Sequence, residues 1–322
     1  MKKRERKTAI LQPKDRIIVD LGDVPVRSAN TLVKKLSPYV GCFRVSKDSL
    51  ITMAKSVINE TEEFRQLFQL LKHSLFWDKR FTGKAKEIFG LSWAVTKMGA
   101  EMFTVDCDGN EEALLEAVKA VEQAIASGTE ALNHFPAIIG VPCSVWMEDS
   151  IRLAQKCGLD GVLVSPDMIW QARDCCRSDF LIIDSGVWPK SILENMDRKS
   201  IKLIVRMRPT RSIMRGADYI VIGERITKAL SPVRAAKKVA KQIEEAIKER
   251  QGKKKDKDKK KGRKDMSKPK EKIEDEEREV EELLDSFVRK PDFNESENTD
   301  EKVRPFNKNV KPDDPSTWIV NP

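Results

Sequence analysis

Charged and hydroxyl-bearing side chains follow short apolar runs throughout the first 225 residues of the chain. They occur in pairs, which are Asp20/Asp23, Arg44/Ser46, Asp78/Arg80, Asp106/Asp108, Pro142/Ser144, Ser165/Asp167, Asp184/Ser185 and Glu224/Arg225. Carboxylates and guanidinium groups in alternation suit the binding of an anionic substrate, and carboxylates also take part in proton transfer. Polar residues end the strands of many soluble barrels without any catalytic role. The pattern therefore identifies a candidate site whose chemistry depends on how these residues are positioned.

Eight short apolar runs precede these pairs and are predicted to be β-strands. They cover residues 17–20, 42–45, 75–78, 102–105, 137–141, 161–164, 180–183 and 219–223. Helix-like segments alternate with them, among them 29–36, 84–97, 111–127 and 231–248. This alternation predicts a closed parallel barrel with its working residues at the C-terminal ends of the strands. An open doubly wound sheet is the alternative, and residues 201–205 form a ninth candidate strand.

The composition changes abruptly near residue 250, which predicts four regions. Residues 1–13 are a basic N-terminal extension, and residues 14–250 form the barrel. Residues 251–272 are a lysine-rich linker, expected to be extended or disordered, and residues 273–322 are an acidic tail with a possible short helix. The predicted fold class is therefore α/β, a (β/α)8 TIM barrel with a disordered, charged C-terminal tail.

The two C-terminal regions carry opposite charge. Residues 251–272 hold twelve Lys and Arg against four Asp and Glu, whereas residues 273–322 hold seven against fifteen. Most charge runs of this kind are solvated linkers. The alternative is non-specific contact of the lysine run with nucleic acid or an acidic partner, without base stacking, because no aromatic residue lies within the run.

Several protein classes are disfavoured by the sequence. No apolar run approaches the ~20 residues that cross a membrane, and no apolar segment follows the basic N-terminus as in a secretory signal. The six cysteines include no CxxC pair, and only two histidines are present, so neither a metal site nor a cofactor is expected. Free thiols in a reducing cytoplasm are the simplest account of the cysteines, and we expect a cytoplasmic protein without a membrane partner.

Five segments, in order along about 225 residues, give a resemblance to the orotidine 5′-phosphate decarboxylase family. Residues 216–229, GADYIVIGERITKA, resemble the last strand and phosphate turn of that family, and residues 158–166, GLDGVLVSP, resemble its sixth strand. The other three segments are 23–25, 98–105 and 186–189. The resemblance implies a phosphate-binding barrel in which residues 201–208 belong to the connection after strand seven rather than to the ring. It also implies a phosphorylated small-molecule ligand and a possible homodimer.

The residues expected to carry the family's chemistry are altered here. The resemblance implies Asp-x-Lys-x-x-Asp on strand three, with a Lys on strand two and an Asp on strand one. This chain has Asp78, Arg80 and Gly83 on strand three, Arg44 on strand two and Asp23 after strand one. An arginine keeps its proton at neutral pH and is a poor proton donor. We expect Asp23, Arg44, Asp78 and Arg80 to cluster at the barrel mouth, with both arginines paired to Asp78 and Asp23.

The phosphate turn also departs from the family. Glu224 stands where the family has an arginine after Gly223, and Trp188 replaces the arginine of the loop after strand seven. The remaining candidates for substrate or phosphate contacts are Ser144, Ser165, Gly186, Gly223 and Arg225.

Two hypotheses follow from these changes. The first is a divergent barrel that lacks decarboxylase activity and binds a phosphorylated ligand or serves as an interaction module. The alternative is an active orotidine 5′-phosphate decarboxylase with rewired charges, or a related phosphate-sugar lyase, in which Asp23, Asp78 and Lys84 would act.

Overall fold

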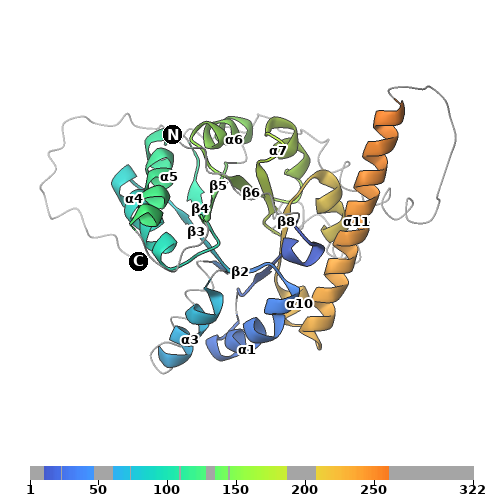
Figure 1. Ribbon diagram of the computed structural model, residues 1–322, viewed down its shortest axis with the longest axis horizontal. Coiled ribbons are helices and arrows are strands. Elements are labelled where there is room, and N and C mark those ends of the chain that lie inside the picture. Colours follow the sequence, from blue (N-terminus) through green and yellow to red (C-terminus); the bar gives the residue numbers. More distant parts are fainter. Residues whose placement is uncertain are drawn as a thin grey trace, which may run out of the picture. The chain divides into compact units, whose positions relative to one another are not determined.

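A computed structural model describes residues 11–22, 24–46, 61–72, 74–108, 110–127, 135–143, 146–186 and 208–260, with the side chains of residues 61, 64 and 253–260 not described. Its strands form a closed barrel in which each strand pairs with its neighbours in chain order (Figure 1). They are β1 (Ile17–Asp20), β2 (Cys42–Ser46), β3 (Leu75–Phe81), β4 (Met102–Asp106), β5 (Ala137–Val141), β6 (Gly161–Val164), β7 (Leu181–Asp184) and β8 (Tyr219–Ile222).

All the pairings around the ring are parallel, and the ring closes through β1 and β8. The predicted closed barrel is therefore confirmed, and the open sheet is not formed. β7 pairs directly with β8, with Ile183 opposite Tyr219 and Asp184 opposite Ile220. The candidate strand at residues 201–205 is thus not one of the eight, and that segment lies outside the described residues.

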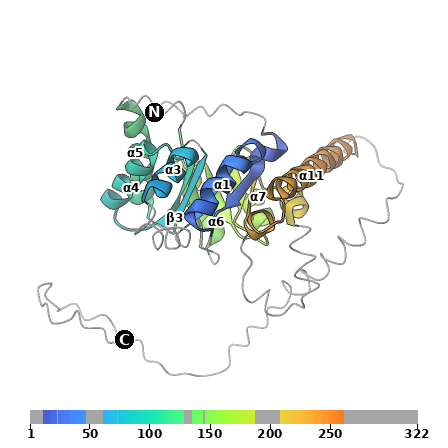
Figure 2. The same ribbon diagram turned by 90° about the horizontal axis from the view of Figure 1, so that it is seen from below.

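Helices surround the barrel in both views of the molecule (Figures 1 and 2). They are α1 (Val26–Leu36), α3 (Thr61–Leu71), α4 (Ala85–Lys97), α5 (Glu111–Ala126), α6 (Met147–Lys156), α7 (Ile169–Cys175), α10 (Glu224–Thr227) and α11 (Pro232–Lys260), with 3-10 turns η1 (Pro13–Arg16) and η2 (Ser37–Tyr39). Asn110 begins α5 by accepting a hydrogen bond from the Ala113 N–H, which satisfies a donor of the first helical turn. None of the described helices is long and apolar enough to span a membrane.

The core has two layers because side chains alternate across each strand. One set of buried residues points into the barrel and comprises Ile18, Cys42, Phe76, Met102, Ala137, Ile139, Leu163, Ile183 and Val221. Their strand neighbours, such as Ile17, Phe43 and Phe103, pack outward against the helices. This alternation matters for function. A residue two positions after an inward-facing core residue also points inward, and it lies at the C-terminal mouth of the barrel.

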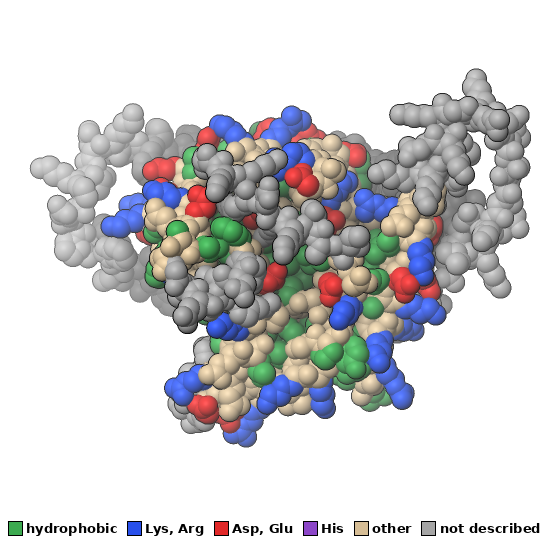
Figure 3. Space-filling view, in the orientation of Figure 1, with side chains coloured by type: hydrophobic (Ala, Val, Ile, Leu, Met, Phe, Trp, Pro, Cys, Tyr) green, Lys and Arg blue, Asp and Glu red, His purple; other side chains and the backbone are tan. Residues whose placement is uncertain are grey.

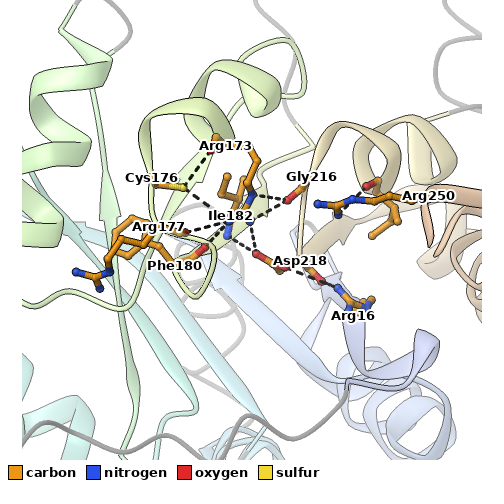
Figure 4. Close-up of polar contacts among 10 residues, drawn as sticks. Arg16, Arg173, Cys176, Arg177, Phe180, Ile182, Gly216, Asp218 and Arg250 are labelled. Carbon is orange, nitrogen blue, oxygen red and sulfur yellow. Dashed lines mark hydrogen bonds and ion pairs between the residues drawn. The ribbon is translucent and has the colours of Figure 1, made fainter. Parts of the chain in front are cut away.

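The N-terminal end of the barrel is held by Arg173 of α7 and Asp218 (Figure 4). Arg173 donates to the carbonyl oxygens of Gly216 and Phe180, and its Nη2 lies 2.6 Å from Asp218 Oδ2. Asp218 also accepts from the Ile182 N–H at 2.9 Å, while Arg16 donates to the Asp218 carbonyl at 3.0 Å. This network joins the starts of β7 and β8 to α7 and η1, so it fixes the barrel at the end away from its mouth.

Helix α11 continues through Lys260, ten residues beyond the predicted end of the barrel at residue 250. The sequence-based expectation of an extended linker is wrong for residues 251–260, and residues 261–272 lie outside the described residues. Lysine and glutamine have high helix propensity, and extending an existing helix avoids the cost of nucleation. The packed first part of α11 therefore accounts for the continuation.

Candidate functional site

The candidate site lies at the C-terminal mouth, where β1 to β4 end. Asp20, Arg44, Asp78 and Thr104 each lie two positions after an inward-facing core residue of the same strand. Asp20 is opposite Arg44, and Arg44 is opposite Phe76 in the strand register. The alternation of side chains therefore directs all four to the inside of the mouth.

Arg44 joins two carboxylates. Its Nε donates to Asp78 Oδ2 at 2.6 Å, and its Nη1 donates to Asp20 Oδ2 at 3.0 Å. The side chains of Arg44 and Asp78 are only 14% and 7% exposed, so water screens their charges weakly. Burial lowers the pKa of Arg44, but the charges of Asp78 and Asp20 outweigh that effect and raise it. Arg44 is therefore a fixed cation and does not release a proton at any ordinary pH.

Thr104 satisfies the second oxygen of Asp78. The Thr104 hydroxyl is fully buried and donates to Asp78 Oδ1 at 2.8 Å. The same hydroxyl oxygen accepts the Arg80 N–H at 2.7 Å, so it links β4 to both residues of β3. With Arg44 on one oxygen and Thr104 on the other, both oxygens of the Asp78 carboxylate have hydrogen-bond partners within the protein.

Replacing Thr104 with valine is expected to lower the free energy of unfolding by about 1–3 kcal/mol. Valine keeps the shape of the side chain but leaves Asp78 Oδ1 and the Arg80 N–H without this partner. Urea denaturation followed by circular dichroism measures the change. Thr82→Val, at an exposed position on the same rim, is the control and should change stability by less than about 0.5 kcal/mol. Equal stability of the two variants would contradict this role for Thr104.

Arg80 does not pair with Asp78, which corrects part of the predicted cluster. Its backbone has φ 47°, and the register between β3 and β4 shifts between Trp77 and Phe81. The Arg80 guanidinium donates instead to Asp106 Oδ2 at 3.0 Å and Asp108 Oδ2 at 2.8 Å. The irregular backbone directs Arg80 to the end of β4, whereas a regular strand would direct it into the mouth, on the same side of β3 as Asp78.

The other predicted site residues lie in different surroundings. Asp23 and Ser144 fall outside the described residues, so the predicted pairing of Asp23 is not observed. Ser165 and Gly223 directly follow β6 and β8, Gly186 lies two residues after β7, and all three share the rim of the mouth. Arg225 is directed elsewhere, because its Nη2 donates to Gln242 on α11 at 2.6 Å. Burial and the charge of Arg208 both lower the pKa of Arg225.

A second buried polar group lies behind the rim, on the helix-facing side of β7. Asp184 is fully buried and accepts from the Ser212 hydroxyl at 2.6 Å and from the Gly186 N–H at 2.8 Å. Arg208 lies 3.7 Å from Asp184 Oδ2 and donates to the carbonyl of Val221. Gly186 has φ 75°, and a side chain there would meet Arg208. These contacts hold the ends of β7 and β8 together, and they engage the guanidinium group of Arg208.

A small cavity of about 180 Å³ opens beside the two carboxylates that bind Arg80. Phe81, Ile88, Val105 and Leu114 form its apolar walls, and Asp106 and Asp108 lie at its edge. Pockets for drug-sized ligands usually measure about 300–1,000 Å³. This cavity is therefore too small to enclose a whole nucleotide, although one ring or a short side chain would fit.

Three residues of the site were not selected from the sequence as catalytic candidates. Asp20 binds Arg44, as was expected of Asp23. Asp106 and Asp108 accept hydrogen bonds from Arg80. The signal for Asp20 was available, since Ile18 points inward and a period of two carries that direction to Asp20. The indication for Asp106 in the sequence was weaker. Its partner Arg80 reaches it only because the end of β3 is irregular.

The amino-acid sequence is related to curated proteins of known name. It is 31% identical over 251 residues to an orotidine 5′-phosphate decarboxylase of Moorella thermoacetica, covering 71% of this chain and 92% of that protein. A protein of the same name from Gloeothece citriformis is 30% identical over 236 residues, covering 70% of this chain and 96% of its own length. The chain belongs to the orotidine 5′-phosphate decarboxylase family. No family model matches it.

The fold of orotidine 5′-phosphate decarboxylases is also recovered by comparison with solved structures. The crystal structure of the enzyme from Lactobacillus acidophilus aligns with a TM-score of 0.54 at 20% identity, covering 70% of this chain and 98% of that one. The structure from Pyrococcus horikoshii OT3 gives a TM-score of 0.52 at 18% identity. Membership of the orotidine 5′-phosphate decarboxylase family thus rests on sequence identity, and these structures support the barrel.

The cations of the described mouth residues are two arginines. Arginines occupy the positions at which the family resemblance implies lysines, namely 44 and 80. None of the inward-facing positions in the described strands is a lysine, and Lys79 and Lys84 are both exposed. Two guanidinium groups and four carboxylates give these residues, Asp20, Arg44, Asp78, Arg80, Asp106 and Asp108, a formal charge of −2. The arrangement can fix charges in place but offers poor proton donors.

Proposed function

We propose that this protein is a divergent member of its family that does not decarboxylate orotidine 5′-phosphate and instead binds a phosphorylated small molecule. The observation that carries the proposal is the pairing of Arg44 with both Asp20 and Asp78. Decarboxylation leaves a carbanion that must be protonated, and an arginine held by two carboxylates is poorly suited to give up a proton. Arg80 is directed to Asp106 and Asp108, so it does not supply the missing acid beside Asp78.

The phosphate end of the site supports the same proposal. Glu224 is exposed and pairs with Lys228, while Arg225 is bonded to Gln242. A carboxylate at the turn repels a phosphate, and binding energy from a remote phosphate normally contributes to transition-state stabilisation. Loss of a general acid reduces rates by about 10²–10⁴ and loss of electrostatic stabilisation by about 10²–10³. The loss of a general acid and the weaker phosphate contact both lower the expected rate of decarboxylation.

Retention of a phosphorylated ligand is supported by the remainder of the rim. Ser165, Gly186 and Gly223 lie just after three neighbouring strands, and backbone N–H groups at such positions bind phosphate in barrels of this type. Without the transition-state contacts, we expect a ligand such as uridine 5′-phosphate to bind without turnover. A thermal shift titration with uridine 5′-phosphate, with uridine as the matched control, measures this binding. A shift with both compounds or with neither would argue against phosphate recognition.

The decisive experiment is an absorbance assay with orotidine 5′-phosphate and the purified full-length protein. We expect a turnover number at least about 10⁴-fold below that of the Moorella thermoacetica relative measured in parallel, because proton donation and the phosphate grip are both weakened. Robust turnover that Asp78→Ala abolishes would overturn the proposal. It would assign the alternative function, an active decarboxylase with rearranged charges.

A further inference from the structure

Helix α11 has two halves with different surroundings. Its first half packs against the barrel through Ala236, Val239, Ile243 and Ala246, all fully buried. These positions are spaced by three, four and three residues, which places them on one face of the helix. Beyond Ile247 the helix contains no hydrophobic residue through its end at Lys260. In both views this end extends past the other described helices (Figures 1 and 2).

The same face continues beyond the packed half with basic residues only. The spacing of three and four residues carries from Ala246 to positions 250, 253, 257 and 260, which are Arg250, Lys253, Lys257 and Lys260. We call these four positions the basic stripe. They span about 15 Å of helix axis at 1.5 Å per residue. The two acidic residues of this end, Asp256 and Asp258, lie at other positions.

Residues 232–249 of α11 hold five Lys and Arg against three Glu, a formal charge of +2, and the end of the helix carries a larger surplus. Lys248 lies 2.6 Å from Glu244, and Lys241 lies 3.8 Å from Glu245. Residues 250–260 hold seven Lys and Arg against two Asp, a formal charge of +5. Lys253 and Lys257, like Lys255 and Lys259, are four residues apart, and like charges at this spacing destabilise a helix. A polyanion along this end would remove that repulsion. In the space-filling view, basic side chains recur along the described part of α11 (Figure 3).

The stripe begins in a cationic cluster on the barrel. Arg250 Nη1 donates to the Ile213 carbonyl at 3.2 Å, next to the network of Arg16, Arg173 and Asp218 (Figure 4). Burial lowers the pKa of Arg250, and the charges of Arg173 and Arg16 lower it further against the opposing charge of Asp218. Three guanidinium groups around one carboxylate leave a surplus of positive charge where the barrel meets the projecting helix.

We propose that the basic stripe of α11 binds the phosphate backbone of nucleic acid without reading its sequence. One strand of a duplex carries a phosphate about every 3.4 Å along the axis, so the stripe covers about four phosphates. Residues 248–260 contain neither an aromatic residue for base stacking nor an apolar residue. The absence of apolar anchors favours nucleic acid over an acidic protein, since protein interfaces depend on desolvated hydrophobic contacts.

Fluorescence anisotropy with labelled 20-nucleotide RNA and 20-base-pair DNA of mixed sequence tests this site in the full-length protein. The variant Lys253→Gln/Lys257→Gln/Lys260→Gln removes three charges from the stripe. The matched control Lys254→Gln/Lys255→Gln/Lys259→Gln removes three charges from other positions of the same segment. Arg250 is kept in both because it also contacts the barrel.

We expect saturable binding that weakens with salt, and a stripe variant whose affinity for duplex DNA falls at least tenfold more than that of the control. Each phosphate contact contributes about −0.9 to the slope of log K against log salt, so the stripe variant should reduce the slope by about 2 to 3. Three outcomes would overturn the proposal. They are no saturable binding at 50 mM salt, equal losses in both variants, and equally tight binding of poly-glutamate, which would indicate an acidic protein partner.

Discussion

Replacing Arg44 with methionine is expected to lower the free energy of unfolding by about 3–5 kcal/mol. The substitution keeps an unbranched side chain that replaces the aliphatic part of arginine but removes the cation that lies between Asp20 and Asp78. Two carboxylates would then face each other at the mouth, where Asp78 is only 7% exposed. Breaking a buried ion pair by removing one partner is far more costly than removing the whole group, because the remaining charge loses its compensation.

Chemical denaturation at pH 7 measures this effect, and two further variants define its cause. Arg80→Met removes a guanidinium that is 44% exposed, so its loss should change stability by no more than about 1 kcal/mol. The triple variant Asp20→Asn/Arg44→Met/Asp78→Asn removes all three charges and should recover most of the lost stability. A triple variant no more stable than Arg44→Met would show that packing of Arg44, and not its charge, stabilises the mouth.

The direction of Arg44 could be predicted from the sequence, whereas the direction of Arg80 could not. Arg44 lies in a regular strand, so apolar alternation predicts its direction, and the predicted pairing with Asp78 is present. Arg80 also has the right parity, but φ at that residue is 47° and the β3–β4 register shifts beside it. A local backbone irregularity of this kind depends on neighbouring strands and leaves no periodic signal in the sequence.

The barrel itself was predictable because it depends on many residues acting together. Strands buried on both faces require continuous apolar runs, and the predicted runs at 17–20, 137–141 and 161–164 match β1, β5 and β6 to the residue. The end of α11 was not predictable in the same way. Its composition cannot form a core, which indicated an extended linker, but a helix can continue from a packed segment without packing itself.

The double variant Arg80→Lys/Gly83→Asp, which rebuilds the family's strand-three pattern, is expected to leave orotidine 5′-phosphate turnover at least about 10⁴-fold below the Moorella thermoacetica relative. A lysine at position 80 inherits a backbone that directs the side chain to Asp106 and Asp108 instead of Asp78. Position 83 is equally unfavourable for aspartate, because Gly83 has φ 133°, a backbone conformation that residues with a side chain rarely adopt. The restored residue types would therefore not restore the family's geometry.

Repair of the phosphate turn separates two explanations for low turnover. One is weak phosphate binding, and the other is the lack of a proton donor beside Asp78. Adding Glu224→Arg to the double variant places after Gly223 the arginine that the family resemblance implies, and removes a carboxylate from the turn. If phosphate binding were the main loss, turnover would rise by about 10²–10³ with the repaired turn, as removal or addition of an electrostatic contact typically changes rates by that factor. We expect a smaller rise, because Arg44 still engages Asp20 and Asp78 and no amine reaches that pair. Full activity in the double variant alone would show that the irregular end of β3 rearranges around a lysine. The direction of Arg80 would then follow from its side chain, and not from the backbone of the strand.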